Sequence, residues 1–413
     1  MKLTPIALAG AASAEGLLPF LTLPSGIKSM SHHISTANAP SGAGFKYPVP
    51  HSSRGGNAVC VSGTVHVPAS TSQNVQFSYK IPQNQTQVTE TFLDFITPGS
   101  NFASSINAGT RNVSGTYALG ATLCTPANNT KPKGVQLLTH GVGLDRYYWD
   151  FTADYSYVDR AVEAGYATFF YDRLGVGESE KPDALDVVQA PLEVEIANSL
   201  ATMLRKGAFG GDAFEKIVGV GHSFGSIITQ AVTSQHPAAL DAAILTGFST
   251  DTSSLPIFLQ GLNLALANQN EPVRFYTLSN GHLVSDNIIS QQIGFFRAPG
   301  FNPAILQLAE LTKASVTFGE LFTTSAVTAP AGNYSNPVAV VNGVNDLPFC
   351  GGNCTSPMNL AMAVRPALYP QLTGERFGSY LAPVCGHALN FHYAAADAFD
   401  YIQAFLRKQN LGM

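Results

Sequence analysis

The stretch that decides the fold of this chain reads Lys216-Ile-Val-Gly-Val-Gly-His-Ser-Phe-Gly-Ser-Ile-Ile-Thr-Gln-Ala-Val232. Its first part, residues 217–220, has the apolar and β-branched composition of a buried strand. Apolar residues at positions 227, 228, 231 and 232 then share one face of a helix. The pentapeptide Gly-His-Ser-Phe-Gly at 221–225 joins the two parts. We therefore predict a strand, a sharp turn and a helix, in this order.

The glycines of the pentapeptide suit such a turn. A strand that turns abruptly into a helix strains its central residue, and the residues two positions away must lack a Cβ atom. Gly221 and Gly225 meet this requirement around Ser223. The turn raises the serine hydroxyl above the sheet and directs the N–H of Phe224 toward negative charge formed beside it. Because ordinary glycine-rich turns also produce this pattern, the flanking strand and helix carry the prediction of a nucleophile elbow.

Strand and helix patterns alternate on both sides of this elbow. Alternation of this kind requires crossover connections between parallel strands. We therefore predict an α/β fold with a mostly parallel central sheet flanked by helices. Besides the elbow, the predicted strands are 135–139, 166–171, 242–248, 338–341 and 380–384, and the predicted helices are 156–164, the residues after Pro191, and 394–406.

Two regions depart from the alternation. Residues 249–335 contain apolar clusters broken by Pro and Gly, which we interpret as an inserted helical lid; simple helical core is the other interpretation. Strand-like runs at 58–67, 75–81 and 113–123 predict a β-rich N-terminal extension along the sheet edge. The predicted organisation is a signal peptide (1–14), an extended N-terminal arm (15–56), a first core part (57–248), the lid (249–335) and a second core part (336–413).

The N-terminus and the composition favour a secreted protein. A positive end at Met1-Lys2, a short apolar stretch at 3–11 and the Ala12-Ser13-Ala14 site resemble a signal peptide. No later run reaches the roughly 18 apolar residues of a membrane span, and the net charge of −5 without a basic run argues against nucleic acid as a partner. Five N-glycosylation candidates fit export: Asn84, Asn112, Asn128, Asn333 and Asn353.

Five cysteines become disulfide candidates in an exported chain. Cys60 and Cys124 flank the β-rich segment, whereas Cys350 and Cys354 bracket a tight loop. The simplest pairing joins each of these pairs and leaves Cys385 free, although the sequence does not fix the connectivity. No set of Cys and His residues has the spacing of metal ligands, so we expect no metal, and we expect no cofactor.

Polar residues follow several of the predicted strands. In a parallel sheet the carboxyl ends of the strands lie along one edge, and ligands bind at that edge. We therefore expect these residues to lie together. They are His140 with Gly141, Asp172, Ser223, Asp346 and His387.

The motifs at these strand ends are Thr-His-Gly-Val-Gly at 139–143, Asp-Arg-Leu-Gly-Val-Gly-Glu-Ser at 172–179, Gly-His-Ser-Phe-Gly at 221–225, Gly-Val-Asn-Asp at 343–346 and Gly-His at 386–387. Together they resemble the α/β-hydrolase superfamily, and in particular its exported fungal members. The order Ser, Asp, His along the chain is also that of the family. The resemblance spans about residues 135 to 410, and the first 130 residues resemble the family only loosely.

The resemblance implies a catalytic triad. Ser223 is the expected nucleophile, and it needs a base within hydrogen-bond reach because a serine hydroxyl is a poor nucleophile. His387 is the expected base, and Asp346 the carboxylate that accepts its far N–H and steadies the imidazolium. Asp251 is the alternative acid and His392 the alternative base.

The backbone N–H groups of Phe224 and Val142 are expected to hold the oxyanion. His222 is expected to pack rather than act as a base, because adjacent side chains of an elbow point to different sides. Residues 172–179 resemble a structural turn of the family, and in the other interpretation Arg173 lines the site.

The reaction expected from these residues is acyl transfer to water through an acyl-enzyme. We expect a small-molecule or lipid-like ester or lactone as the substrate, because alcohols leave more readily than amines and the lid is apolar. A serine at the elbow disfavours the epoxide hydrolase and dehalogenase branches, which use aspartate there. A peptidase or amidase of the same fold and an inactive hydrolase-fold binding module remain as alternatives.

Overall fold

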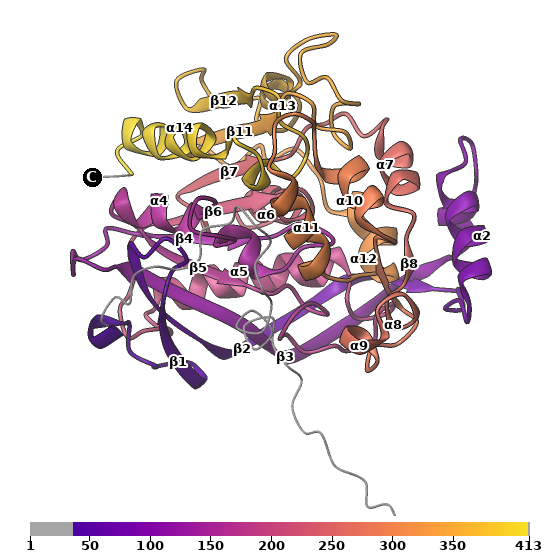
Figure 1. Ribbon diagram of the computed structural model, residues 1–413, viewed down its shortest axis with the longest axis horizontal. Coiled ribbons are helices and arrows are strands. Elements are labelled where there is room, and N and C mark those ends of the chain that lie inside the picture. The colour runs from indigo at the N-terminus through magenta and orange to yellow at the C-terminus, as the bar shows by residue number, and fades with distance from the viewer. Residues whose placement is uncertain (1–35, 412–413) are drawn as a thin grey trace, which may run out of the picture.

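The computed structural model describes residues 36–411 and is organised around a nine-stranded sheet (Figure 1). Six neighbouring strands, from β5 to β12 in the order of the sheet, run parallel. This confirms the predicted fold class. The order is β1 (Lys46–Ser52), β2 (Ala58–Phe77), β3 (Asn107–Pro126), β5 (Ala167–Tyr171), β4 (Val135–Thr139), β6 (Ile217–His222), β7 (Ala242–Thr246), β11 (Val338–Gly343) and β12 (Phe377–Ala382).

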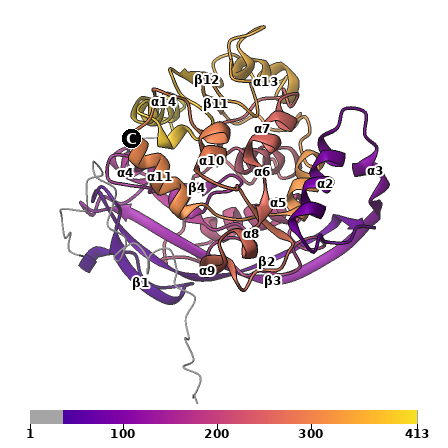
Figure 2. The same cartoon turned by 45° about the vertical axis from the view of Figure 1, so that its right-hand side comes forward.

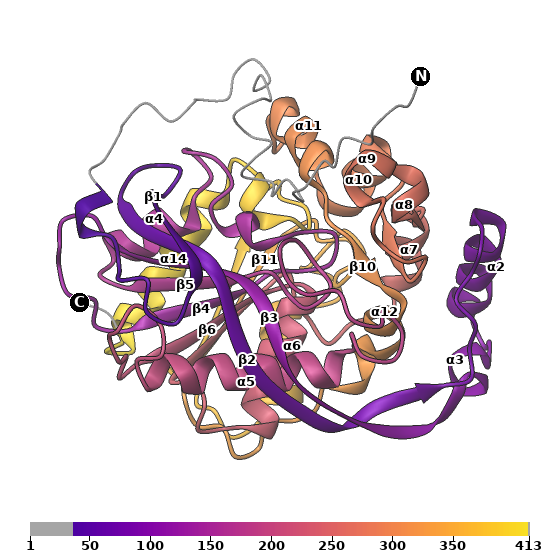
Figure 3. The same cartoon turned by 90° about the horizontal axis from the view of Figure 1, so that it is seen from below.

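Helices cover both faces of the parallel strands. On one face α4 (Tyr157–Glu163) packs against α14 (Ala395–Lys408), and on the other α5 (Ala190–Arg205) packs against α6 (Phe224–Gln235) (Figure 3). A further helix, α13 (Leu360–Leu368), connects β11 to β12. Every residue of β4, β5 and β7 is buried, as expected for strands that are covered on both sides.

The helix starts follow from local chemistry. Ser156 precedes α4, and its hydroxyl accepts a hydrogen bond from the N–H of Asp159 at 3.0 Å. Pro191 lies in the first turn of α5, where a missing N–H removes no helical hydrogen bond. These two signals place the helices where the sequence predicts them.

The N-terminal extension is one long ribbon. β2 and β3 are each 20 residues long and pair with each other antiparallel, and β3 in turn pairs with β5. The prediction of separate strands at 58–67 and 75–81 is therefore wrong, because β2 continues from the first into the second and ends at Phe77. Residues 70–73, which lie between the predicted strands, are polar and mostly exposed, so they interrupt the apolar pattern without ending the strand.

Two helices lie at the far end of this ribbon, α2 (Gln85–Ile96) and α3 (Phe102–Ser105) (Figures 2 and 3). The stretch 89–96, which resists assignment from the sequence, belongs to α2. This helix begins at Asn84, whose side chain accepts a hydrogen bond from the N–H of Gln87 at 3.0 Å.

Between β7 and β11, residues 249–335 form an additional layer, which we call the inserted segment. Its three short strands form a separate antiparallel sheet, so the prediction of a purely helical insertion is incomplete. Strands of two or three residues are too short to leave a periodic pattern. The elements are α7 (Leu255–Leu262), β8 (Ala265–Leu266), α8 (Ala267–Asn270), α9 (Pro272–Phe275), β9 (His282–Val284), α10 (Ile288–Phe295), α11 (Pro303–Thr312), β10 (Val316–Thr317) and α12 (Phe318–Thr323).

The end of the ribbon packs against the inserted segment. The Gln85 amide donates to the carbonyl oxygen of Leu264 at 3.0 Å and accepts from the N–H of Leu266 at 3.1 Å. Aromatic rings from both regions also meet, with centroids 5.3 to 6.1 Å apart. This tip cluster consists of Tyr79, Phe92, Phe95 and Phe102 from the end of the ribbon with its helices α2 and α3, and of Phe318 and Phe322 from α12.

The predicted signal peptide, residues 1–14, and the first part of the predicted arm lie outside the described residues. The rest of that arm contains β1, which pairs with β2 at the edge of the sheet. Within residues 36–411 no helix has both the length and the apolar character that a membrane crossing requires.

Candidate active site

The turn at residues 221–225 joins β6 directly to α6. Ser223 lies between the two elements with φ 56° and ψ −120°, a backbone conformation that residues other than glycine rarely adopt. A Cβ atom on Gly221 would come 2.3 Å from the carbonyl oxygen of Gly225, and one on Gly225 would come 2.0 Å from the carbonyl oxygen of Thr139. Both glycines are therefore required by the close approach of the backbone.

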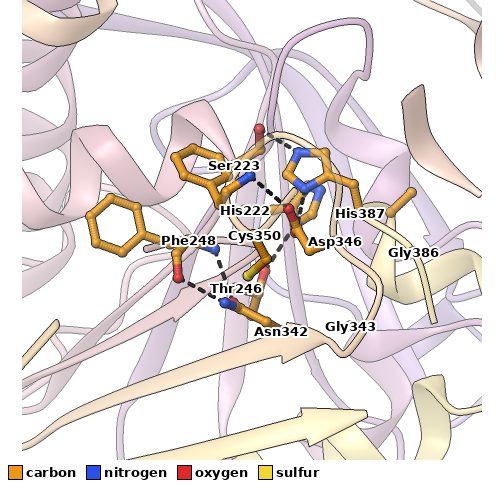
Figure 4. Close-up of polar contacts among 12 residues, drawn as sticks. His222, Ser223, Thr246, Phe248, Asn342, Gly343, Asp346, Cys350, Gly386 and His387 are labelled. Atoms are coloured by element: carbon orange, nitrogen blue, oxygen red, sulfur yellow. Dashed lines mark hydrogen bonds and ion pairs between the residues drawn. The ribbon is translucent and has the colours of Figure 1, made fainter. Parts of the chain in front are cut away.

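Ser223, His387 and Asp346 form a continuous chain of hydrogen bonds (Figure 4). The Oγ of Ser223 lies 2.8 Å from Nε2 of His387, and Nδ1 of His387 lies 2.6 Å from Oδ2 of Asp346. These contacts suit the tautomer in which Nδ1–H donates to the carboxylate and Nε2 accepts the serine proton. The chain can therefore take a proton from the hydroxyl and stabilise the resulting imidazolium.

The loop after β11 fixes the carboxylate. The second oxygen of Asp346 accepts the N–H of Phe349 at 3.0 Å, and its backbone carbonyl accepts the N–H of Gly352 at 2.8 Å. A disulfide between Cys350 and Cys354 closes the same loop. The side chain of Asp346 is completely buried, so its position is set by the protein alone.

Three phenylalanine rings surround the imidazole of His387. Phe258 of α7 and Phe295 of α10 lie 5.6 and 6.0 Å from it, and Phe349 lies 5.8 Å from it, between ring centroids. Ser223 is 5 % and His387 is 1 % exposed. The inserted segment therefore covers the hydrogen-bonded chain in this conformation.

The loop after β4 lies directly beside the serine. A Cβ atom on Gly141 would come within 2.8 Å of the Cβ of Ser223. The N–H of Phe224 belongs to the first turn of α6, where N–H groups have no partner within the helix. Val142, which follows Gly141 on this loop, and Phe224, which follows Ser223, are therefore both near the serine.

The model of a family described as the alpha/beta hydrolase family matches residues 136–400, which is more than half of the chain. The chain belongs to the alpha/beta hydrolase family. The match covers every residue of the hydrogen-bonded chain from Ser223 to His387. The β2–β3 ribbon precedes the matched region of this alpha/beta hydrolase.

Solved structures similar to this alpha/beta hydrolase have low sequence identity to it. A thermophilic esterase from Thermogutta terrifontis is 16% identical, with a TM-score of 0.47 over 71% of this chain and 94% of that chain. A monoacylglycerol lipase from Paleococcus ferrophilus is 14% identical, with a TM-score of 0.47 over 70% and 98%. An epoxide hydrolase from Vigna radiata is 14% identical, with a TM-score of 0.46 over 71% and 95%. No curated protein matches the chain.

The alternative base, His392, is fully engaged elsewhere in the hydrolase. Its Nε2 accepts the N–H groups of Gly386 and Arg297, each at 3.0 Å, and its Nδ1–H donates to the carbonyl oxygen of Ala388 at 2.9 Å. Burial lowers the pKa of His392 to about 4, so the ring is neutral at physiological pH. It braces the loop that carries His387 against the end of α10.

The two other candidates also have local partners. Asp251 accepts the N–H of Ser253 at 2.9 Å, and hydrogen bonds from Ser253 lower its pKa. His222 stacks on Tyr148 with centroids 4.5 Å apart, and its Nδ1 lies 3.0 Å from Oγ1 of Thr246. Burial holds the pKa of His222 well below its ordinary value. His222 therefore packs as a neutral ring behind the elbow.

A small apolar cavity borders the site. Val142 and Gly143 of the loop after β4 form one wall, and Phe295 links the cavity to the imidazole of His387. Leucine and valine side chains of the inserted segment, such as Leu262 and Val284, form most of the rest. A ligand in this cavity would meet hydrocarbon on nearly every side.

A buried charged cluster at the end of β5 is the main feature that the sequence analysis missed. Arg173 pairs with Glu193 of α5 at 2.8 Å and with Glu320 of α12. From the sequence alone, Arg173 is expected to belong to a structural turn or, in the other interpretation, to line the site. Its two carboxylate partners lie 20 and 147 residues away in the chain, and no local pattern indicates such a pairing.

The cysteines pair as the simplest arrangement predicts. Cys60 is bonded to Cys124, and Cys350 to Cys354, while Cys385 is buried and free. All of the predicted glycosylation sequons have exposed asparagines, which is the placement that a surface glycan needs. They are Asn84, Asn112, Asn128, Asn333 and Asn353.

Proposed function

We propose that this protein is a serine hydrolase that cleaves a carboxylic ester or lactone through a Ser223–His387–Asp346 triad and an acyl-enzyme. The observation that carries the proposal is the hydrogen-bonded chain, 2.8 Å from Ser223 Oγ to His387 Nε2 and 2.6 Å from His387 Nδ1 to Asp346 Oδ2. The strained backbone at Ser223 and the loop beside it support the same assignment.

In the proposed reaction, Ser223 Oγ attacks the substrate carbonyl while His387 Nε2 takes its proton. The imidazolium is stabilised by the buried carboxylate of Asp346 and then gives the proton to the departing alcohol. Water, activated by His387 in turn, releases the acid from the serine. The N–H groups of Phe224 and Val142 stabilise the negative charge on the carbonyl oxygen in both halves of the reaction.

The surroundings of the triad favour esters over amides. The cavity beside Val142 and Phe295 is apolar and small, which suits a hydrocarbon acyl or alcohol group rather than a charged peptide. We also propose that the inserted segment acts as a lid, since it buries Ser223 and contacts the His387 ring through Phe258 and Phe295. Substrate entry then requires part of this segment to move.

We further propose that the protein is exported, like the fungal members that its motifs resemble. Disulfides persist in oxidising compartments and are rare in the cytosol. The pairs Cys60–Cys124 and Cys350–Cys354 and the exposure of the five sequon asparagines support this localisation. N-terminal sequencing of protein collected from the medium of the native host tests it, because export predicts a start near residue 15 or a few residues later.

The test of the chemistry is labelling with a fluorophosphonate probe together with hydrolysis of a series of nitrophenyl esters of increasing acyl length. Wild-type protein is expected to be labelled and to turn over the esters, whereas S223A loses both activities. Ser234, on the same helix α6, provides the matched control, and S234A is expected to retain both. A labelled S223A protein, or an active one, would overturn the assignment of the nucleophile.

The alternatives give different results in the same assay. An amidase or peptidase would hydrolyse an aminoacyl-anilide faster than the short esters. A binding module without activity would show no labelling and no turnover of any acyl substrate although the wild-type fold is intact. Either outcome would replace the esterase proposal.

A further inference from the structure

The charged cluster at the end of β5 joins the core to the inserted segment. Arg173 is completely buried, and its Nη1 donates to Glu193 Oε2 at 2.8 Å and to Glu320 Oε1. Glu193 belongs to α5 on the core, whereas Glu320 belongs to α12 of the inserted segment. One guanidinium therefore ties two layers of the molecule together.

Glu320 is itself held firmly within the inserted segment. Its second carboxylate oxygen accepts the N–H of Thr317 at 2.7 Å, and the Thr317 hydroxyl accepts the N–H of Glu320 at 3.1 Å. This reciprocal pair is a capping box that opens α12. The carboxylate thus moves with α12 as a unit, so its contact with Arg173 forms only when the helix is in the position seen here.

The same arginine reaches both sides of the proposed oxyanion hole. Its Nη2 lies 3.4 Å from the carbonyl oxygen of Gly141, and its guanidinium carbon lies 4.6 Å from the ring centroid of Phe224. The backbone N–H of Arg173 also donates to Nε2 of His140 at 3.0 Å, and Nδ1–H of His140 donates to the Gly141 carbonyl at 2.9 Å. Two contacts therefore orient one carbonyl group.

This carbonyl matters because it shares a peptide plane with an expected oxyanion donor. The C=O of Gly141 and the N–H of Val142 belong to one trans peptide, so they point in opposite directions. Fixing the carbonyl toward His140 and Arg173 therefore aims the Val142 N–H away from them. A rotated peptide would turn the N–H away from its working direction and leave the hole with one donor fewer.

We propose that Arg173 is a positioning residue that makes the oxyanion hole depend on the seating of α12. When α12 is seated, Glu320 holds the guanidinium against the Gly141 carbonyl and the Phe224 ring. When the inserted segment lifts, Arg173 loses this partner and the peptide of Val142 loses part of its support. This inference rests on the proposed hydrolase function and extends it, since full catalytic competence then requires a closed lid.

The charge balance of the cluster adds a dependence on pH. Two carboxylates face one guanidinium, and burial together with the Glu320 charge raises the pKa of Glu193 to about 8. Glu193 is therefore protonated near neutral pH, and the cluster carries no net charge. Stability contributed by this raised pKa is present in full below the ordinary value near 4.5 and is lost as the pH rises through about 8.

The histidine and tyrosine side chains that interact with the cluster do not change charge in this window. Burial lowers the pKa of His140 and of His282, so both rings are already neutral. Burial raises the pKa of Tyr171, which stays protonated. Ionisation of Glu193 is thus the event that adds a buried negative charge near pH 8 and weakens the closed arrangement.

The two carboxylates provide a matched pair of variants, Glu320→Gln on the inserted segment and Glu193→Gln on the core. In E320Q, Arg173 stays paired with Glu193 on the core, while the charged contact to α12 is lost. We expect kcat on a soluble nitrophenyl ester to fall about tenfold to 100-fold, which is less than the full loss of an oxyanion donor. Affinity for a trifluoromethyl ketone, whose adduct carries an oxyanion, is expected to fall in parallel.

In E193Q the amide resembles protonated Glu193, so the loss of kcat at pH 7 is expected to be smaller than in E320Q. Wild-type activity is expected to decline above pH 8, and this decline is expected to be reduced in E193Q. Glu178→Gln serves as the control, because Glu178 pairs with a different buried arginine, Arg146. E178Q is expected to keep the wild-type kcat and pH profile.

Equal kcat and equal ketone affinity in wild type, E320Q and E178Q would overturn the proposal, as would a lower melting temperature of E320Q without any kinetic change. If circular dichroism shows that E320Q does not fold, the test is the decline of activity above pH 8 in wild type and E193Q. An identical decline in the two proteins would overturn the proposal. These failures differ from failure of the proposed function, in which wild-type protein would neither hydrolyse esters nor react with the fluorophosphonate.

Discussion

The two disulfides use the same bond in two very different regions. Cys60–Cys124 joins neighbouring residues of β2 and β3 in the N-terminal ribbon, across a sequence separation of 64. Cys350–Cys354 spans a separation of 4 and closes the loop that positions Asp346. The first therefore constrains a large part of the unfolded chain, whereas the second constrains few conformations but lies beside the proposed triad. We therefore expect the first disulfide to contribute more to stability and the second to contribute more to catalysis.

The largest expected effect is the loss of kcat when the carboxylate of Asp346 is removed, and it sets an upper limit for the loss caused by misplacing that carboxylate. In Asp346→Asn the amide donates where the carboxylate accepted, so His387 is held in the wrong tautomer. We expect kcat for ester hydrolysis to fall on the order of 10⁴-fold, as in other serine triads, with little change in the fold. Asp251→Asn is the matched control and is expected to keep the wild-type rate. A larger loss in D251N than in D346N would assign the acid to Asp251 instead.

Removal of the ribbon disulfide is expected to affect stability and to spare the chemistry. Replacement of Cys60 and Cys124 by Ala releases a loop with a sequence separation of 64, which corresponds to about 4 kcal/mol of lost stability in the chain-entropy model. Urea unfolding measures this change, and kcat of the folded variant measures the chemistry. A loss of kcat larger than that caused by removing the second disulfide would contradict the expected difference between the two disulfides.

Removal of the loop disulfide is expected to show the opposite balance. Replacement of Cys350 and Cys354 by Ala releases a loop with a sequence separation of only 4, which corresponds to about 2 kcal/mol. The freed loop positions Asp346 less well, and a small misplacement of a catalytic group costs on the order of 100-fold in rate. We expect kcat to fall about tenfold to 100-fold. Unchanged kcat would show that the loop hydrogen bonds suffice without the cross-link.

The smallest expected effect concerns His392, which holds the loop that carries His387 by hydrogen bonds and not by a disulfide. His392→Phe removes the acceptor of the Gly386 and Arg297 N–H groups and the donor to Ala388. Net hydrogen bonds are worth about 0.5 to 1.5 kcal/mol each, so we expect kcat to fall about tenfold.

Two partial mimics of His392 separate its roles. His392→Gln retains an acceptor near the position of Nε2, and His392→Asn retains a donor near the position of Nδ1. Each is expected to restore part of the rate lost in H392F, measured on the same ester. If both variants are as slow as H392F, the ring serves only as packing between Phe296 and Phe301.

The sequence predicts the parts of this molecule that local rules specify. The elbow at 221–225 follows from glycines that the backbone contacts require, and the parallel sheet follows from alternating apolar strands and helices. The strand-end residues Ser223, Asp346 and His387 lie together because parallel strands end along one edge. In each case the prediction combines short local patterns with a general rule of how parallel sheets are built.

The remaining features depend on contacts between distant parts of the chain. The pairing of Arg173 with Glu193 and Glu320 joins three elements, and each residue alone resembles an ordinary charged surface position. The continuous strand β2 was missed because its polar stretch faces solvent while the ladder to β3 continues. The small sheet of the inserted segment pairs strands that are too short to leave a periodic pattern in the sequence.

The tip cluster has a consequence for how the catalytic unit is delimited. Tyr79 and Phe95 of the ribbon pack on Phe322 with centroids 5.3 Å away, and Phe322 lies two residues after Glu320 on the same helix. The family match begins only at residue 136. A truncated protein that starts there would keep Ser223, Asp346 and His387 but would lack the aromatic rings that pack on α12. If α12 supports the oxyanion hole as proposed, full activity therefore also requires residues that precede the family match.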